Sequence, residues 1–234
     1  MKSRIAKIIS NRGYCSRRDA EKLVLAGSVK VNGELACDVA TNFPDDSIIT
    51  VNDEEVRPFN KTRLWIYHKP LGVITTRKDP QGRKTVFDAF DSSEHLVSVG
   101  RLDINSQGLL LITNDKTLAA HLENPANNFV RIYKVRFFGK IPDKLFDVQK
   151  GIEIDGVRYK PIKLKVLKQG INSWCEMQLS EGKNREIRKI LEHFDLQVNR
   201  LIRTQYGPFK LGDLQEGEIK EINYVKSSCG EFKK

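Results

Sequence analysis

The stretch Gly100-Arg101-Leu102-Asp103-Ile104-Asn105-Ser106-Gln107-Gly108 separates the apolar segment Val97–Val99 from an apolar run at residues 109–112. Short apolar runs of this kind are typical of buried β-strands, so the polar groups between them are carried close to a hydrophobic core. A carboxylate in such a place is normally paired or hydrogen-bonded, because burying it alone costs several kcal/mol. Asp103 is therefore either a turn residue whose side chain caps the backbone or part of a functional site.

The residues on either side of this stretch predict a mixed sheet. From about residue 64 onward short apolar strands are separated by single helices, and Asp155-Gly156 is a typical hairpin turn. Strands are expected at residues 65–67, 73–76, 97–99, 109–113, 130–138, 162–167 and 175–179. Helices are expected at residues 115–123, 143–150 and 184–194. This order predicts an α+β fold with a largely antiparallel sheet over residues 62–227, followed by a short tail at 228–234.

A small separate module is predicted over residues 1–60. Two short helices, the second beginning at Ser16 and ending at Gly27, precede a hairpin whose turn is Asn32-Gly33. Residues 58–62 are expected to form the linker to the sheet. The module therefore has two helices and a hairpin of its own.

Charge is unevenly distributed within this module. Residues 1–30 contain eight basic and two acidic side chains, whereas residues 31–60 contain one basic and seven acidic side chains. Such segregation predicts one basic face, although a basic run on a helix can also be an ordinary solvated surface. The candidate phosphate-binding residues are Arg12, Arg17, Arg18, Lys22 and Lys30.

Composition narrows the class of protein. The 234 residues carry 40 basic and 30 acidic side chains, a formal net charge of +10 that favours a polyanionic partner, either nucleic acid or an anionic membrane. The four cysteines and four histidines lack metal-ligand spacing, so no metal site is expected and the thiols are expected to be reduced. Neither GxxxxGK[ST] nor GxGxxG after a strand is present. Without a signal peptide or a run of about 20 apolar residues, a cytoplasmic location with no membrane partner is expected.

Several motifs resemble one enzyme family. Gly100-Arg101-Leu102-Asp103, followed by Ser106, residues 108–111 and Thr113-Asn114-Asp115, resembles the catalytic signature of pseudouridine synthases in their RsuA/RluB branch. Residues 3–50 resemble the S4-like RNA-binding domain that this branch carries at its N-terminus. Other segments similar to this branch occur in the expected order at residues 68–73, 79–86, 131–135, 181–188 and 206–212. The resemblance covers nearly the whole chain and favours a functional role for Asp103.

The resemblance implies a reaction and roles for five residues. Uridine in a folded RNA becomes pseudouridine, with the base detached from C1′ and rejoined through C5, without a cofactor or metal. Asp103 is implied as the nucleophile, Arg188 as the cation that pairs with it and keeps it ionised, and Tyr133 as the residue beside the flipped base. Arg101 is expected to contact RNA or fill the gap left by the base, and Ile187 to form an apolar wall for the uracil. The plainer alternatives are that Arg188 is a solvated helix arginine, Tyr133 an ordinary strand aromatic and Ile187 a core residue.

The implied substrate is ribosomal RNA. The segment at residues 79–86 is most similar to members of the branch that act on large-subunit 23S rRNA, with 16S rRNA of the small subunit as the alternative. The sequence leaves open whether naked RNA or a ribosome-assembly intermediate is used, and the family suggests a monomer. A catalytically silent assembly factor is the other interpretation, but intact Asp103, Tyr133 and Arg188 argue against it. An RNA methyltransferase is disfavoured because no Gly-rich loop follows a strand.

Overall fold

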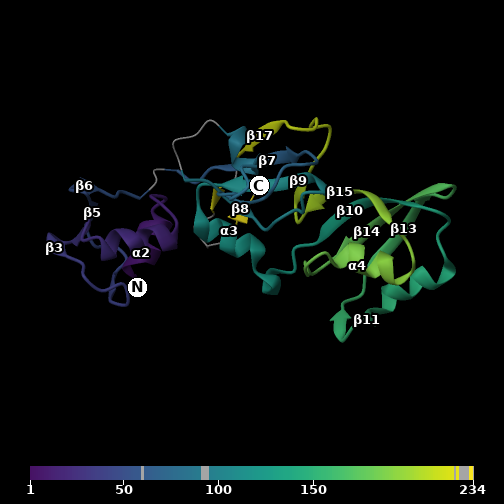
Figure 1. Ribbon diagram of the computed structural model, residues 1–234, viewed down its shortest axis with the longest axis horizontal. Helices are drawn as coiled ribbons and strands as arrows, with labels where there is room; N and C mark the ends of the chain where they lie inside the picture. Colours follow the sequence, from purple (N-terminus) through teal and green to yellow (C-terminus); the bar gives the residue numbers. More distant parts are fainter. Residues whose placement is uncertain (59–60, 91–94, 224, 227–231, 234) are drawn as a thin grey trace.

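The computed structural model describes residues 1–234 except 59–60, 91–94, 224, 227–231 and 234. Figure 1 shows a small N-terminal module at one end of a longer body that is built on one extended sheet. The predicted linker and tail lie partly outside the described residues. Within the tail, Phe232–Lys233 (β19) pairs with Val225–Lys226 (β18). No helix in the described part of the chain is long and apolar enough to span a bilayer.

The N-terminal module packs two short helices against small sheets. Its elements are β1 (Lys2–Arg4), α1 (Ile5–Asn11), α2 (Arg17–Leu25), β2 (Val29–Val31), β3 (Glu34–Leu35), β4 (Asn42–Pro44), β5 (Ile49–Val51) and β6 (Glu54–Glu55). Strands β3-β2-β5-β6 form an antiparallel sheet in that order, and β1 pairs with β4. Apolar residues between Ile5 and Val56 form a core of their own, which explains how so short a segment holds its shape.

Local chemistry sets the ends of these elements. Ser16 caps α2, because its Oγ accepts a hydrogen bond from the Asp19 N–H at 3.2 Å. Gly27, with φ of +70°, follows the helix in the left-handed conformation that favours glycine. Asn32 and Gly33 both have positive φ, as a tight hairpin turn between β2 and β3 requires. The predicted second helix and hairpin are confirmed.

The body of the protein is a nine-stranded sheet within the described residues. Its main path runs β13-β14-β10-β15-β9-β7-β17, with β8 paired to β9 and β16 paired to β15. Its strands are β7 (Leu64–Lys69), β8 (Val97–Val99), β9 (Gln107–Thr113), β10 (Arg131–Phe138), β13 (Lys163–Lys168), β14 (Asn172–Leu179), β15 (Val198–Tyr206), β16 (Phe209–Lys210) and β17 (Ile219–Ile222). Every pairing is antiparallel except that of β9 with β15. The predicted α+β fold with a largely antiparallel sheet is confirmed.

Two element predictions are wrong, and one central strand was missed. Residues 73–76 form no strand, because Ile74 makes only an isolated bridge to Thr85. Residues 143–150 form a 3-10 helix, η3 (Asp143–Lys150), and not an α-helix. Strand β15 was not expected, because arginines interrupt its apolar pattern, and yet it occupies the middle of the sheet.

The helices cover different halves of the sheet. Helix α3 (Lys116–Glu123) packs against β7, β8 and β9 and is followed by η2 (Pro125–Asn127). Helix α4 (Glu186–His193) and η3 pack against β10, β13, β14 and β15, together with the hairpin of β11 (Ile152–Ile154) and β12 (Val157–Tyr159). The short helix η1 (Val86–Ala89) packs over the opposite face of β7 and β9. The two halves therefore have separate cores and meet along β9 and β15.

Glycine is required where the two halves meet. Gly108 of β9 lies opposite Arg203 of β15 in the parallel register. Its φ is +103°, and a Cβ at this position would lie 2.3 Å from the Arg203 carbonyl oxygen. Any side chain would push the strands apart or force the backbone to change. The glycine therefore brings the β8–β9 loop against β15.

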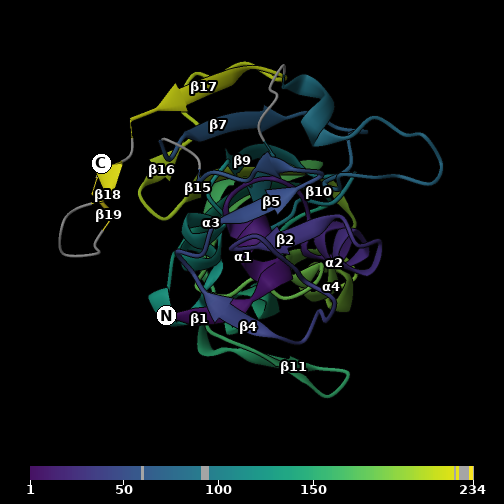
Figure 2. The ribbon, with the colours of Figure 1, turned by 90° about the vertical axis from the view of Figure 1, so that its left-hand side faces the viewer.

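A lysine connects the N-terminal module to the sheet. Lys116 of α3 donates from Nζ to the Ser10 hydroxyl oxygen at 2.6 Å and to the Cys15 carbonyl oxygen at 2.8 Å. Burial lowers the pKa of Lys116 to about 8. In Figure 2, where the module faces the viewer, α1 lies next to α3. This contact holds the module against the end of the sheet that α3 covers.

Candidate active site

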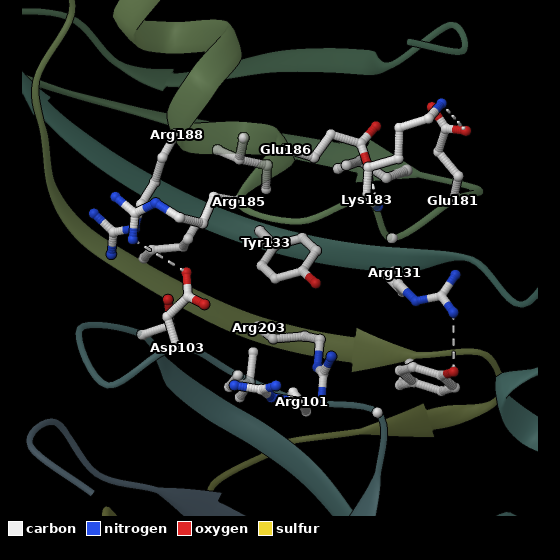
Figure 3. Close-up of a pocket in the computed structure, with 18 of the residues that line it drawn as sticks. Arg101, Asp103, Arg131, Tyr133, Glu181, Lys183, Arg185, Glu186, Arg188 and Arg203 are labelled. Carbon is white, nitrogen blue, oxygen red and sulfur yellow. Dashed lines mark hydrogen bonds and ion pairs between the residues drawn. The ribbon is translucent and has the colours of Figure 1, made fainter. Parts of the chain in front are cut away.

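A cavity of about 300 Å³ lies where β10 and β15 face the loop between β8 and β9 (Figure 3). Its walls come from residues 100–106, from the two strands and from residues 179–188, which lead into α4. Its basic residues are Arg101, Arg131, Lys183, Arg185, Arg188 and Arg203, and its acidic residues are Asp103, Glu123, Glu181 and Glu186. Segments that are far apart in the sequence therefore surround one strongly charged space.

The loop that carries Asp103 is fixed by its neighbours. Leu102 is buried, its carbonyl oxygen accepts from the Thr75 hydroxyl at 2.8 Å, and its N–H donates back to Thr75 Oγ1 at 3.3 Å. The Ser106 N–H donates to the Asp103 carbonyl oxygen at 2.9 Å and closes a turn. Because Leu102 occupies the core position, the Asp103 side chain lies at the cavity wall, 34% exposed, and not in the core.

A buried lysine supports the same loop from behind. Lys69, at the end of β7, is fully buried, and its Nζ donates to the carbonyl oxygens of Ser106 and Pro70, both at 2.9 Å. Burial lowers the pKa of Lys69 to about 8, although the negative charge of Asp103 acts in the opposite direction. Lys69 therefore ties the end of the Asp103 loop to the sheet.

The ionic partner of Asp103 differs from the predicted one. Arg185 Nη1 lies 3.6 Å from Asp103 Oδ2, and Figure 3 shows this ion pair across the cavity. Arg185 is the N-cap residue of α4 and has a left-handed backbone, with φ of +53°. Because it precedes the helix, its side chain does not follow the helical spacing of Arg188. The prediction that Arg188 makes the direct pair with Asp103 is therefore wrong for this structure.

Arg188 instead holds the loop backbone. Its Nη2 donates to the Asn105 carbonyl oxygen at 2.6 Å, and its Nη1 donates to the Val198 carbonyl oxygen at 3.4 Å. Burial lowers the pKa of Arg188, as does the charge of Arg185, whereas the charge of Asp103 raises it. Arg188 thus interacts electrostatically with Asp103 and fixes the backbone two residues after it.

The other predicted substrate contacts all line the same cavity. The ring of Tyr133 on β10 lies in the middle of the site in Figure 3, and it packs against the cores of both halves of the sheet. Ile187 is 4% exposed and belongs to the core under α4, while it also lines the cavity. Arg101 is exposed at the cavity rim. Asp103, Tyr133, Arg188, Arg101 and Ile187 are therefore brought together.

Two further arginines were missed as site residues. Arg203 of β15 is 3% exposed and donates from Nε to the Leu109 carbonyl oxygen at 2.7 Å, while its buried Nη2 has no hydrogen-bond partner among the described residues. Arg131 of β10 donates to the Tyr206 hydroxyl at 3.0 Å, with its guanidinium 4.8 Å from that ring's centroid. Arg131 is the first residue of the family-like segment at residues 131–135, and this segment was the sequence signal that could have identified it. Arg203 could not be identified from the sequence, because its strand, β15, was not predicted.

Two carboxyl groups flank the turn before α4. Glu186 is 4% exposed, and its Oε2 accepts from the Lys183 N–H at 2.9 Å, whereas its buried Oε1 has no partner in the described part of the chain. Burial raises the pKa of Glu186 to about 7, and the nearby charge of Glu181 acts in the same direction. Glu181 itself accepts from the Lys183 ammonium at 2.7 Å. The turn that carries Arg185 therefore includes a carboxyl group that changes its protonation near neutral pH.

The basic residues of the N-terminal module divide into two groups. Arg12 is engaged within the module, donating to the carbonyl oxygens of Val56 at 3.0 Å, Asp45 at 2.9 Å and Ser47 at 2.7 Å, and its role as a phosphate contact stays a prediction. Lys30 is paired with Asp53 at 2.6 Å, and Lys22 is within 3.9 Å of Asp19. Arg17 and Arg18 are exposed at the start of α2 and make no ion pair with a described residue. Of the five candidates, these two arginines are therefore the most accessible to an RNA phosphate.

The comparisons with known proteins identify the family. A family model described as RNA pseudouridylate synthase matches residues 63–193, and the S4 domain model matches residues 3–42. The fold and site therefore define an RNA-modifying isomerase with an N-terminal RNA-binding domain. The chain belongs to the RNA pseudouridine synthase family, as the resemblance predicted.

Three relatives illustrate the match. An uncharacterized RNA pseudouridine synthase of Rickettsia felis is 52% identical over 221 residues, which cover 94% of this chain and 96% of that protein. The ribosomal large subunit pseudouridine synthase B of Haemophilus influenzae is 37% identical over 246 residues, covering 97% of this chain and 68% of that protein. A crystal structure of a pseudouridylate synthase covers 94% of this chain with a TM-score of 0.69 and 24% identity. The structural likeness shows that the fold is shared.

Proposed function

We propose that this enzyme isomerises a specific uridine of ribosomal RNA, in the 23S rRNA of the large subunit. The observation that carries the proposal is the cavity in which Asp103 and Tyr133 lie among six basic side chains. The choice of RNA is supported by the 37% identity with a ribosomal large subunit pseudouridine synthase over 97% of this chain. The similarity of residues 79–86 to the 23S-specific members points the same way.

Asp103 is the nucleophile in the proposed mechanism. One Asp103 carboxylate oxygen bonds to the nucleotide as the C1′–N1 bond breaks, and the detached uracil turns so that its C5 can bond to C1′. A new C1′–C5 bond then forms, the carboxylate leaves, C5 loses its proton and N1 gains one, so that product and substrate have the same mass. The pair with Arg185 orients the Asp103 carboxylate at the cavity wall, and the carboxylate is the nucleophilic form of the group.

The rest of the cavity positions the base. A uridine within folded RNA must leave its stack to reach Asp103, and Tyr133 presents an aromatic ring at the centre of the site where a flipped base can stack. Ile187 supplies an apolar wall, and Arg101 at the rim contacts the RNA or fills the vacated stack. Arg203 also lines the cavity, and its buried Nη2, which has no hydrogen-bond partner among the described residues, is assigned here as a donor to the bound base.

Binding is divided between two parts of the chain in this proposal. Residues 1–60 form an RNA-binding module in which Arg17 and Arg18 contact phosphates, and residues 62–227 carry out catalysis, with 228–234 as a tail. Phosphate contacts fix position without reading sequence. The enzyme works as a monomer in the cytoplasm, on naked rRNA or on a ribosome-assembly intermediate.

Mapping of pseudouridines tests the target. Pseudouridines in the rRNA of cells with and without this gene are compared, and the gene is restored either intact or as Asp103→Asn. One 23S position should lose its pseudouridine and regain it only with the intact gene. Loss of a 16S position instead would contradict the choice of subunit. Unchanged 23S and 16S maps would contradict rRNA as the substrate.

A further inference from the structure

The side of β10, β13 and β14 that faces away from α4 carries cations and aromatics, and no helix of the described residues packs against it. Along β14, Cys175, Met177 and Leu179 are buried, while the alternating residues from Trp174 to Gln178 are only partly buried. Because successive side chains of a strand point to opposite faces, the second set lies on the side away from α4. In Figure 1, α4 and β11 both lie on one side of β10, β13 and β14. The other side is called here the open face.

Strand register places the side chains of the open face in rows. In one row Lys165 of β13 lies opposite Glu176 of β14, which lies opposite Lys134 of β10. In the next row Trp174 lies between Lys168 and Arg136, and Arg136 lies opposite Arg200 of β15. The basic residues of the open face are Lys134, Arg136, Lys163, Lys165, Lys168 and Arg200.

The charge of this face is strongly one-sided. Six cations face a single acidic side chain, Glu176, among the described residues of these rows. None of the six makes an ion pair within 4.0 Å to a described residue, and only Arg200 has its head group engaged, by donation to Gln107 Oε1 at 2.7 Å. Repulsion between such cations is relieved by a polyanion.

Two aromatic side chains are interleaved with the cations. Trp174 is half-buried beside Arg136, and Phe138, two residues further along β10, is 64% exposed. Exposed aromatics among cations are typical of surfaces that bind unpaired nucleotides, because a base stacks on the ring while the cations hold the phosphates. An acidic protein surface would use the cations alone.

The open face is separate from the active site. Tyr133 points into the cavity, whereas its neighbour Lys134 points to the opposite side of β10. Arg200 connects the two sides, because Gln107 is the residue that follows the Asp103 loop and begins β9. RNA bound on the open face therefore lies behind the catalytic loop and cannot include the reacting nucleotide.

We propose that the open face is a second RNA-binding surface, which holds a single-stranded segment of the substrate RNA away from the target uridine. The inference extends the proposed function by giving the enzyme a third contact with its RNA, beyond the cavity and the N-terminal module. It requires an RNA substrate but not a particular target position. Its partner is the RNA backbone, through phosphates, with bases stacked on Trp174 and Phe138.

Charge neutralisation tests the surface. The triple variant Lys134→Gln, Arg136→Gln, Lys165→Gln is compared with Lys144→Gln, Lys150→Gln, Lys189→Gln, which removes three exposed charges from η3 and α4 on the covered side. The probe is a labelled 23S rRNA fragment that contains single-stranded segments, titrated at several salt concentrations. Three lost contacts should lower the salt slope of log K by about 2 units and weaken binding on the order of 100-fold at 0.1 M salt. The control triple should retain most of its affinity. Equal losses in the two triples would overturn the proposal.

Tryptophan fluorescence gives a second, independent readout. The chain has two tryptophans, and Trp65 is buried in the core, so Trp65→Phe leaves Trp174 as the only indole. Binding of the same RNA should quench this emission, and Lys134→Gln with Arg136→Gln in that background should shift the quenching to higher RNA concentration. Unchanged emission at saturating RNA would contradict stacking on this face. Both measurements report RNA binding and not catalysis. An error in the proposed target uridine would therefore change the pseudouridine maps but not these two binding results.

Discussion

The arginines around Asp103 have different predicted roles, and truncating each one separates them. Arg188 donates to the Asn105 carbonyl oxygen at 2.6 Å and is half-buried, whereas Arg185 reaches Asp103 at 3.6 Å with 47% of its own side chain exposed. Hydrogen bonds from a charged group contribute about 1.5–3 kcal/mol, and exposed ion pairs about 0.2–1 kcal/mol. Arg188→Ala should therefore cost more than Arg185→Ala.

These energies convert to rates if they hold Asp103 in its reactive position. Each 1.36 kcal/mol or so is a factor of ten in rate, so Arg188→Ala should slow turnover about 10- to 150-fold, and Arg185→Ala less than about 5-fold. Arg188→Lys should recover only part of the loss, because one ammonium cannot reproduce the two directed N–H groups that reach Asn105 and Val198.

The assay is single-turnover formation of pseudouridine at saturating RNA, with RNA affinity measured separately. Saturation removes differences in binding, so the rate reports on the geometry around Asp103. A larger rate loss for Arg185→Ala than for Arg188→Ala would refute the assignment and make the direct ion pair the important contact. A normal rate for Arg188→Ala would show that the Asn105 contact does not position the loop.

Three other predictions concern Glu186, Gly108 and the arginines of the N-terminal module. Glu186 has a folded pKa of about 7 against 4.5 for a free side chain, so its stabilising contribution, present below pH 4.5, is lost as pH rises to 7. In urea unfolding, Glu186→Gln should therefore be more stable than the parent above pH 7, by up to about 3 kcal/mol, and show no such gain near pH 4. Gly108→Ala should lower the free energy of unfolding by about 3 kcal/mol or more, because its Cβ would lie 2.3 Å from the Arg203 carbonyl oxygen. Gly82→Ala, which has open space around its Cβ, should lower it by only about 1–2 kcal/mol. Similar losses of unfolding free energy in the two variants would contradict the close approach of β9 and β15 at Gly108. Arg17→Ala with Arg18→Ala should reduce the salt slope of log K for RNA binding by about 1.5 units. Lys30→Ala should leave that slope nearly unchanged, because the charge of Lys30 is paired with Asp53. A larger change of slope in Lys30→Ala than in the double arginine variant would remove the two arginines from the interface.

Much of the fold could be predicted because its signals are local. The cap at Ser16, the turn at Asn32-Gly33 and the apolar run of β9 each depend on a few consecutive residues. Strand β15 could not be predicted in the same way. Its Arg203 is buried through a hydrogen bond to the Leu109 carbonyl oxygen, which is supplied by a strand about 90 residues earlier in the chain.

The site was predicted in its residues but not in its contacts. Asp103, Tyr133 and Arg188 were identified from the family-like segments and do line one cavity. The choice of Arg185 as the ionic partner depends on its left-handed backbone before α4, which helical spacing does not reveal. The sequence also does not reveal the contacts of Arg12, because the carbonyl groups that accept its hydrogen bonds come from residues more than 30 positions away.

Pseudouridine formation by Asp103→Asn tests most directly whether Asp103 is the nucleophile. This change keeps the size of the side chain but removes its charge and most of its nucleophilicity, and its contact with Arg185 lies at the exposed cavity wall, so the fold should persist. RNA binding should be retained, because phosphate contacts dominate affinity and one anion has been removed. We expect Asp103→Asn to give a folded protein that binds its RNA and forms no detectable pseudouridine. Measurable pseudouridine from folded Asp103→Asn, after deamidation back to aspartate is excluded by mass spectrometry, would show that another residue carries the reaction.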